Sequence, residues 1–77
     1  MGIRRGMLIK NVAERPLVIR LKKRVLRMKA GEEVLVTAEE VRDSVLRENL
    51  QLRTIAVVRP STEEEADALS REIAANR

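Results

Sequence analysis

Carboxylates are the side chains of this chain best suited to chemistry, and they occur in three groups. Glu32 and Glu33 are adjacent, Glu39 and Asp43 are one helical turn apart, and four acids occupy residues 63–67. Paired carboxylates could bind Mg²⁺ or transfer protons in a cleft. Two of the three groups stand at predicted helix starts, however, where capping and the helix dipole favour acids. We therefore expect no metal site, no cofactor and no catalytic residue among them.

The composition removes the groups on which most catalytic mechanisms depend. The chain has 77 residues and no Cys, His, Trp, Tyr or Phe. It lacks a thiolate or imidazole nucleophile, the usual zinc ligands and a general base that titrates near neutral pH. The serines have no His or well-placed Lys to activate them, and no Gly-Lys-Ser/Thr sequence follows Gly2 and Gly6. We predict that the protein is not an enzyme.

A basic cluster within residues 20–29 is the second candidate for chemistry. It consists of Arg20, Lys22, Lys23, Arg24, Arg27 and Lys29. Cationic side chains on a hairpin can neutralise phosphates, contact an acidic protein surface, or protect a strand edge against unwanted pairing. The absence of interleaved aromatic side chains weakens the case for nucleic acid. A nucleic-acid site would use Arg20, Lys22, Lys23, Arg24 and Arg27, and a protein interface would use the first four of these.

Charge is divided along the chain. Residues 1–29 hold ten Lys or Arg and one acid, Glu14, whereas residues 60–77 hold two Lys or Arg and five acids. A basic front and an acidic rear favour either attraction to phosphate or head-to-tail contact between copies. The core is thin and has no aromatic side chain, which favours stabilisation by oligomerisation or docking.

The apolar pattern predicts one α+β domain with four or five short antiparallel strands, arranged as a small sandwich or barrel. Strands are expected over residues 7–12, 17–21, 25–28, 33–36 and 53–59, with a hairpin tip at residues 22–24. Leu17, Ile19 and Leu21 should face the core. Gly31 predicts a turn because glycine adopts a positive φ without strain. Residues 1–5 are expected to be a mobile basic terminus.

A capping box predicts a helix that crosses before the last strand. Thr37 can accept a hydrogen bond from the Glu40 amide while Glu40 reaches back to the Thr37 amide. The helix is expected over residues 38–49 of a β-rich domain that spans residues 1–60. Its inward side would carry Ala38, Val41, Val45 and Leu52.

A second capping box, from Ser61 to Glu64, predicts an acidic helix within residues 61–77 that ends near Ala75. This segment is expected to be an appendage of the same domain. The apolar stripe of the helix consists only of Ala66, Leu69 and Ile73, which is too narrow to anchor it firmly. We predict that these side chains pack loosely on the domain or form an interface with a neighbouring subunit.

No segment predicts a membrane location. Apolar runs stay well short of the roughly 20 residues that span a bilayer, and no signal-like segment opens the chain. The absence of cysteine gives no indication of an oxidising compartment. We expect the protein to be in the cytoplasm and to have no membrane partner.

Two motifs cover much of the chain: I-x-N followed by R-P-L-x-I, and then L-x-x-G-E-x-V-x-V-T-x-E-E-V, with Met28 at the position of its Leu, and a later I-x-V-V. They are carried by Ile9, Asn11, Arg15, Pro16, Leu17, Ile19, Met28, Gly31, Glu32, Val34, Val36, Thr37, Glu39, Glu40, Val41, Leu46, Leu50 and residues 55–58. In this order, residues 7–58 resemble a type of small protein encoded among the virion-assembly genes of tailed phages. The basic tip, Lys22-Lys23-Arg24, differs from the short, often Gly-bearing tip of that type.

The resemblance implies a structural component of a virus particle. Such a component would be a small β-rich module that binds a capsid, neck or tail surface in many symmetry-related copies, assembled in the host cytoplasm and retained in the virion. Two other hypotheses stay open. One is a nucleic-acid-binding regulator that uses the hairpin. The other is an adaptor that binds one protein through an exposed strand edge.

Overall fold

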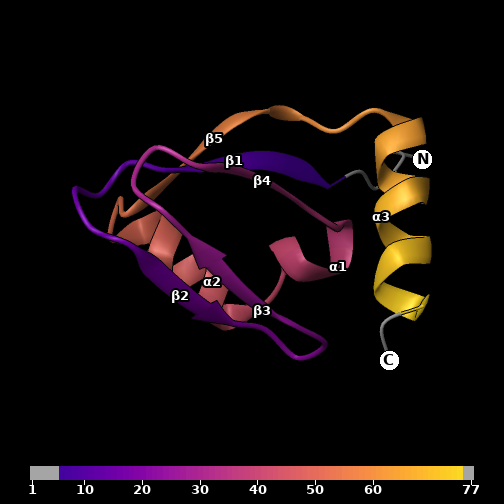
Figure 1. Cartoon of the computed structure of the whole chain (residues 1–77), viewed down its shortest axis with the longest axis horizontal. Helices are drawn as coiled ribbons and strands as arrows, with labels where there is room; N and C mark the ends of the chain where they lie inside the picture. Colours follow the sequence, from indigo (N-terminus) through magenta and orange to yellow (C-terminus); the bar gives the residue numbers. More distant parts are fainter. Residues whose placement is uncertain (1–5, 76–77) are drawn as a thin grey trace.

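The computed structural model describes residues 6–75, in which five strands and three helices form (Figure 1). The strands are β1 (Met7–Asn11), β2 (Leu17–Arg20), β3 (Val25–Met28), β4 (Glu33–Val36) and β5 (Ile55–Pro60). The helices are α1 (Ala38–Val41), α2 (Ser44–Gln51) and α3 (Glu63–Ala75). The expected basic terminus, residues 1–5, lies outside the described residues.

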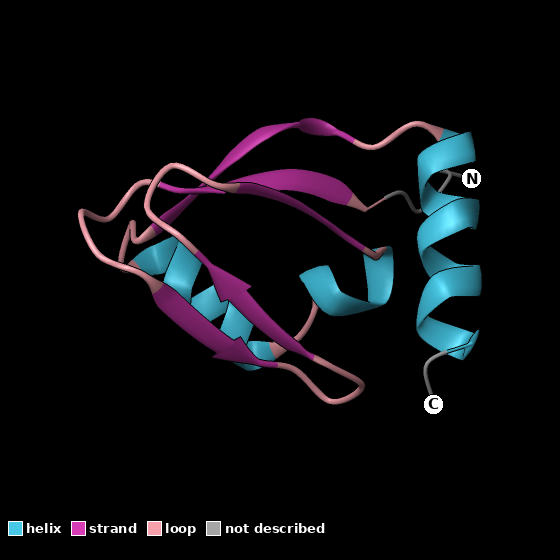
Figure 2. Ribbon diagram, viewed as in Figure 1, coloured by secondary structure: helices cyan, strands magenta, loops and turns pink. Residues whose placement is uncertain are grey.

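The strands form two small antiparallel sheets. β1 is the centre of a three-stranded sheet in the order β4-β1-β5, and β2 and β3 form a separate hairpin. Figure 2 shows the hairpin opposite the three-stranded sheet, with α1 on the side toward α3. The predicted α+β class with antiparallel strands is confirmed. The barrel alternative is wrong, because within residues 6–75 no ladder joins the two sheets.

The core lies between the two sheets because each strand turns alternate side chains inward. β2 and β3 bury one face of the hairpin, each strand of the larger sheet contributes one residue, and α2 contributes one. The buried cluster contains Ile9, Leu17, Ile19, Leu21, Leu26, Met28, Val36, Leu46 and Ile55. The predicted inward face of Leu17, Ile19 and Leu21 is confirmed.

The single helix predicted over residues 38–49 is instead two helices. α1 ends after one turn, and Asp43 then caps α2 by accepting a 2.8 Å hydrogen bond from the Val45 amide. Because α2 starts anew at this cap, its buried residue is Leu46, while Val45 faces solvent. Leu52, which was expected inside, is 66% exposed just beyond the last turn.

Both predicted helix starts are stabilised by reciprocal caps, but the second is displaced by one residue. The Glu40 amide donates to Thr37 Oγ1 at 3.1 Å and the Thr37 amide donates to Glu40 Oε1 at 2.9 Å, as predicted. At α3 the same two bonds join Thr62 and Glu65, at 2.9 and 3.1 Å. Ser61 is buried instead, and its amide donates to the Gly6 carbonyl at 3.0 Å.

Gly6 permits a close approach between the first described residue and the end of β4. A Cβ atom at this position would overlap the backbone carbonyl oxygen of Val36. Gly6 therefore allows the backbone to pack closely against β4. A larger residue at this position would push the chain away from that strand.

The end of α2 is a Schellman motif in which the left-handed residue is not glycine. The Thr54 amide donates to the Asn49 carbonyl and the Arg53 amide to the Leu50 carbonyl, both at 3.2 Å. Arg53 has a φ of 61°, the only positive φ of a non-glycine residue in the described part of the chain. Glycine is the usual residue here because a Cβ atom is strained in this conformation.

Replacing Arg53 by Gly is expected to raise the free energy of unfolding by up to about 1 kcal/mol. Stability should rise because glycine adopts a φ of 61° without the backbone strain that a Cβ atom causes. Urea unfolding would measure it, with Arg53→Ala as the matched control, since alanine removes the same charge but keeps the strain. Equal stability of the Gly and Ala variants would show that the backbone is not strained.

Candidate functional site

The outer side of the β2–β3 hairpin gathers exposed valines and arginines on one surface. Val18, Arg20, Val25 and Arg27 alternate with the inward residues of β2 and β3 and therefore share this side. Val18 lies opposite Arg27, and Arg20 lies opposite Val25. The valines are 58% and 42% exposed, and both arginines are exposed. We name these four residues the Val/Arg face.

Four cations of the basic cluster, two on the Val/Arg face and two that follow its arginines by two residues, have no ion-pair partner within residues 6–75. They are Arg20, Lys22, Arg27 and Lys29, all exposed. Uncompensated charges on one small surface raise the local potential and attract anionic partners. The arrangement therefore offers cationic binding next to apolar contact.

Arg24 points the other way and is fully engaged within the chain. Its Nε donates to Glu40 Oε2 at 2.7 Å, and its Nη2 donates to Glu40 Oε1 and to the Leu35 carbonyl, both at 2.8 Å. Only 23% of its side chain is exposed. Arg24 thus ties the hairpin to α1 and covers the edge of β4, so the structure gives it a structural role.

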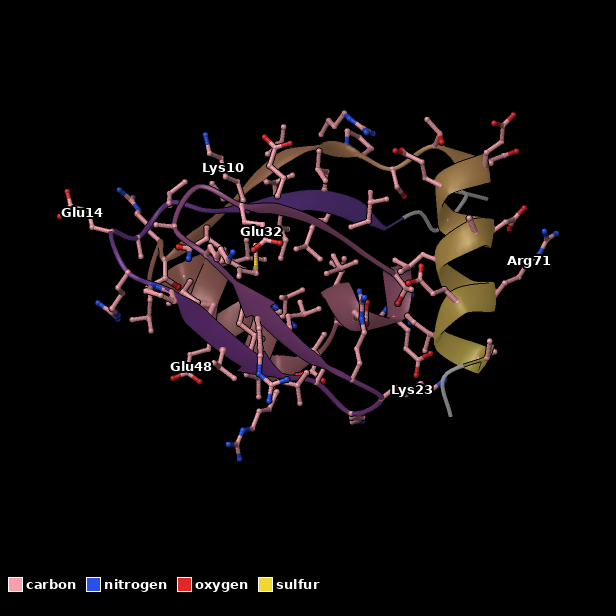
Figure 3. The ribbon with its side chains drawn as sticks, in the orientation of Figure 1. Lys10, Glu14, Lys23, Glu32, Glu48 and Arg71 are labelled. Atoms are coloured by element: carbon pink, nitrogen blue, oxygen red, sulfur yellow. The ribbon has the colours of Figure 1, made fainter. Side chains whose placement is uncertain are left out.

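Lys23 is held only weakly. Its Nζ lies 3.4 Å from Glu39 Oε2, and both side chains are largely exposed. Figure 3 shows Lys23 at the end of the hairpin nearest α3. An exposed pair of this kind contributes little to stability, so Lys23 is free to change partner.

The apolar stripe of α3 faces the domain. Leu69 is 8% exposed, and Ala66 and Ile73 are half-buried on the same side of the helix, which packs toward β4. Leu69 therefore serves the packing of its own chain. The exposed residues of α3 outside this stripe include Glu64, Arg71 and Glu72.

A cleft of about 570 Å³ separates α3 from the hairpin tip and α1. Lys22 and Lys23 line the cleft on the hairpin side. Glu39 and Asp43 line it near α1, and Asp67 lines it on α3. Within residues 6–75 no group of three potential metal ligands occurs. Thr37 and Ser70 supply hydroxyls to the lining, which contains neither His nor Cys.

β5 is an edge of the larger sheet, and its outer side has no paired strand within the described residues. Val57 and Val58 are half-exposed there. The register with β1 shifts between Leu8 and Ile9, and Pro60 ends the strand. Because a bulge and a terminal proline both oppose pairing with another strand, this edge is a poorer docking site than the Val/Arg face.

Arg59 and Glu65 form an exposed ion pair between β5 and α3. Arg59 Nη1 and Nη2 each donate to one carboxylate oxygen of Glu65 at 2.8 Å. This hydrogen bonding, followed by that from the Thr62 amide, lowers the pKa of Glu65 from 4.5 to about 2. The hydrogen bond to Glu65 also raises the pKa of Arg59.

The Arg59–Glu65 pair predicts a small acid sensitivity. Because the pKa of Glu65 is lower in the folded state, the pair stabilises the fold above about pH 4.5, and this stabilisation is lost as the pH falls toward about 2. Thermal unfolding across this range would compare the wild type with Glu65→Gln, whose side-chain oxygen can still accept a hydrogen bond from the Thr62 amide. We expect the advantage of the wild type to vanish at the acid end; a pH-independent difference would contradict the assignment.

No protein-family model, curated protein or solved structure matches the chain. None of the helices within residues 6–75 has the length and apolar character needed to cross a membrane. We therefore infer the function from the exposed surfaces described above and from the residue pattern.

Proposed function

We propose that this chain is a non-enzymatic structural component of a tailed-phage particle, present in multiple copies, and that its Val/Arg face is its contact surface in the assembled particle. The observation that carries this proposal is that each outward cross-strand pair of the hairpin joins an exposed valine to an arginine without an ion-pair partner in residues 6–75. Arginine is enriched in protein interfaces, and exposed aliphatic groups beside it gain by leaving water. The residue pattern over 7–58 supports a place in the virion.

The hairpin is suited to act as a rigid binding platform. Its inner side chains are in the core, and the Leu21 amide donates to the Arg24 carbonyl at 2.9 Å to close the tip. Arg24 then anchors the tip to Glu40. A surface held in this way loses little conformational entropy on binding, which favours affinity. Its arginines can form paired hydrogen bonds with carboxylates of a capsid, neck or tail protein.

Co-expression with capsid, neck and tail proteins of the same phage, followed by size-exclusion chromatography with light scattering, tests the proposal. We expect the chain to co-elute with one of them in several copies. Val18→Thr/Val25→Thr should weaken this binding at least tenfold, because it replaces apolar contact by hydroxyls with little change of shape. The matched control is Val57→Thr/Val58→Thr, which alters two half-exposed valines on β5.

Two outcomes would contradict the proposal. Elution of the chain alone in the presence of every particle protein would remove the assembly role. Equal loss of binding in the hairpin variant and in the β5 variant would show that the Val/Arg face is not the contact surface.

A nucleic-acid-binding regulator is the second candidate, and the unpaired cations of the hairpin favour it. Arg20, Lys22 and Arg27 would contact phosphates, since Arg24 is engaged by Glu40. Fluorescence anisotropy with labelled duplex DNA and single-stranded RNA would test it. Binding that falls steeply with salt and survives Val18→Thr/Val25→Thr would support this role, and no binding at low salt would exclude it.

A further inference from the structure

We propose that the partner of the Val/Arg face is α3 of a second copy of this chain, so that copies associate head to tail. The inference rests on the proposed function, because it names a partner for the same face. It follows from the charges, the spacing and the placement of the two surfaces.

The exposed side of α3 is acidic. Glu64 and Glu72 are exposed and have no ion-pair partner within residues 6–75, and Arg71 is the one cation in the helix. Figure 3 shows Arg71 directed away from the body of the molecule, so it shares the exposed side with Glu64 and Glu72, and the two acids leave an excess of one negative charge there. The hairpin carries the opposite charge. Each copy therefore has one surface that attracts the other surface of its neighbour.

The spacing of side chains on the two surfaces agrees. Glu64, Ala68 and Glu72 follow one another at intervals of four residues, so they form one row with the acids about 12 Å apart. Arg20 and Arg27 are diagonal neighbours on the hairpin, about 8 Å apart. Their long side chains can span the remaining distance, so each arginine can meet one acid. The valines between them would then lie against Ala68.

The two surfaces face different directions within one molecule. α3 stands at one end of the chain, and the Val/Arg face is on the side of the hairpin that is turned away from the three-stranded sheet (Figure 1). Contact between unlike surfaces is heterologous, and repetition closes into a ring or continues as a filament. Either form gives the multiple copies that the proposed function requires.

Charge reversal tests the contact with two complementary variants. Arg20→Glu/Arg27→Glu reverses the hairpin, and Glu64→Lys/Glu72→Lys reverses the row on α3. All four positions are exposed, so circular dichroism should show that both variants remain folded. In sedimentation velocity at low salt, the wild type should associate with rising concentration, and each variant alone should remain monomeric. An equimolar mixture should regain association, because each reversed surface meets its complement.

The inference would be overturned if the wild type stayed monomeric at every concentration at low salt. It would also be overturned if either variant alone associated like the wild type, or if the mixture sedimented no faster than its components. A monomeric wild type that still binds a phage protein through the Val/Arg face would remove the self-contact and leave the proposed function intact. Restored association in the mixture, without binding to any phage protein, would support the self-contact and contradict the proposed binding to other particle proteins.

Discussion

Replacing Asn11 by Ala is expected to lower the free energy of unfolding by about 3 kcal/mol or more. Asn11 is fully buried at the end of β1. Its Nδ2 donates to the carbonyls of Arg15 and Met28 at 2.9 and 3.0 Å, and its Oδ1 accepts from the Ala13 amide at 2.9 Å. Alanine would remove these three hydrogen bonds and open a cavity. Because small domains are marginally stable, chemical unfolding should show a much weakened protein.

Two further substitutions at Asn11 separate hydrogen bonding from packing. Asn11→Leu fills the volume but cannot form the bonds, so it should be destabilised nearly as much as the Ala variant. Asn11→Asp keeps the oxygen that accepts from Ala13 but places a carboxyl beside two carbonyl oxygens. Burial there should raise its pKa, so this variant should be most stable below about pH 4 and lose stability as the pH rises. A loss under about 1 kcal/mol in all three variants would contradict the bonding scheme.

Breaking the Arg24–Glu40 pair is expected to cost about 3 kcal/mol, near the lower end for buried pairs. Glu40 is buried, and its carboxylate accepts two hydrogen bonds from Arg24 and one from the Thr37 amide. Arg24→Met would leave the carboxylate without its countercharge, and Glu40→Gln would leave the guanidinium without one. Either change detaches the hairpin tip from α1. Urea unfolding of both variants would measure the loss.

A double-mutant cycle isolates the energy of this pair, and the structure supplies a matched exposed pair. Lys23 and Glu39 join the same two elements with the same separation in sequence, but their side chains are 50% and 71% exposed. Coupling between Arg24→Met and Glu40→Gln should be about 2 kcal/mol, whereas coupling between Lys23→Met and Glu39→Gln should be below about 0.5 kcal/mol. Similar coupling in the two cycles would show that burial does not set the difference.

Strands were predictable because their alternation is local. Ile19 and its neighbours in residues 17–21 alternate between core and solvent, and Gly31 has the positive φ, 81°, that its turn requires. The same alternation places Val18 and Val25 on the outer side, so the apolar half of the Val/Arg face could have been read from the sequence. The charge of the cluster does not by itself indicate that valines lie between its arginines.

Other features depend on contacts between distant residues. Asp43 is a residue type that often caps helices, but a continuous helix also satisfies the apolar spacing, so the sequence does not specify the break between α1 and α2. The engagement of Arg24 by Glu40 joins residues sixteen positions apart and becomes visible only when the hairpin folds against α1. Ser61 is predicted to cap α3, but Thr62 does so instead. Ser61 is buried after β5, where its amide donates to the Gly6 carbonyl.

Lysine footprinting by mass spectrometry tests most directly whether the Val/Arg face is the surface that binds in the assembled state. Lys22 and Lys29 are exposed, and each lies two residues from an arginine of the face, whereas Lys10 lies on β1 in the other sheet (Figure 3). In the complex isolated by co-expression, acetylation of Lys22 and Lys29 should fall several-fold while Lys10 keeps its free-chain reactivity. Protection of Lys10 together with unchanged reactivity of Lys22 and Lys29 would contradict the proposal.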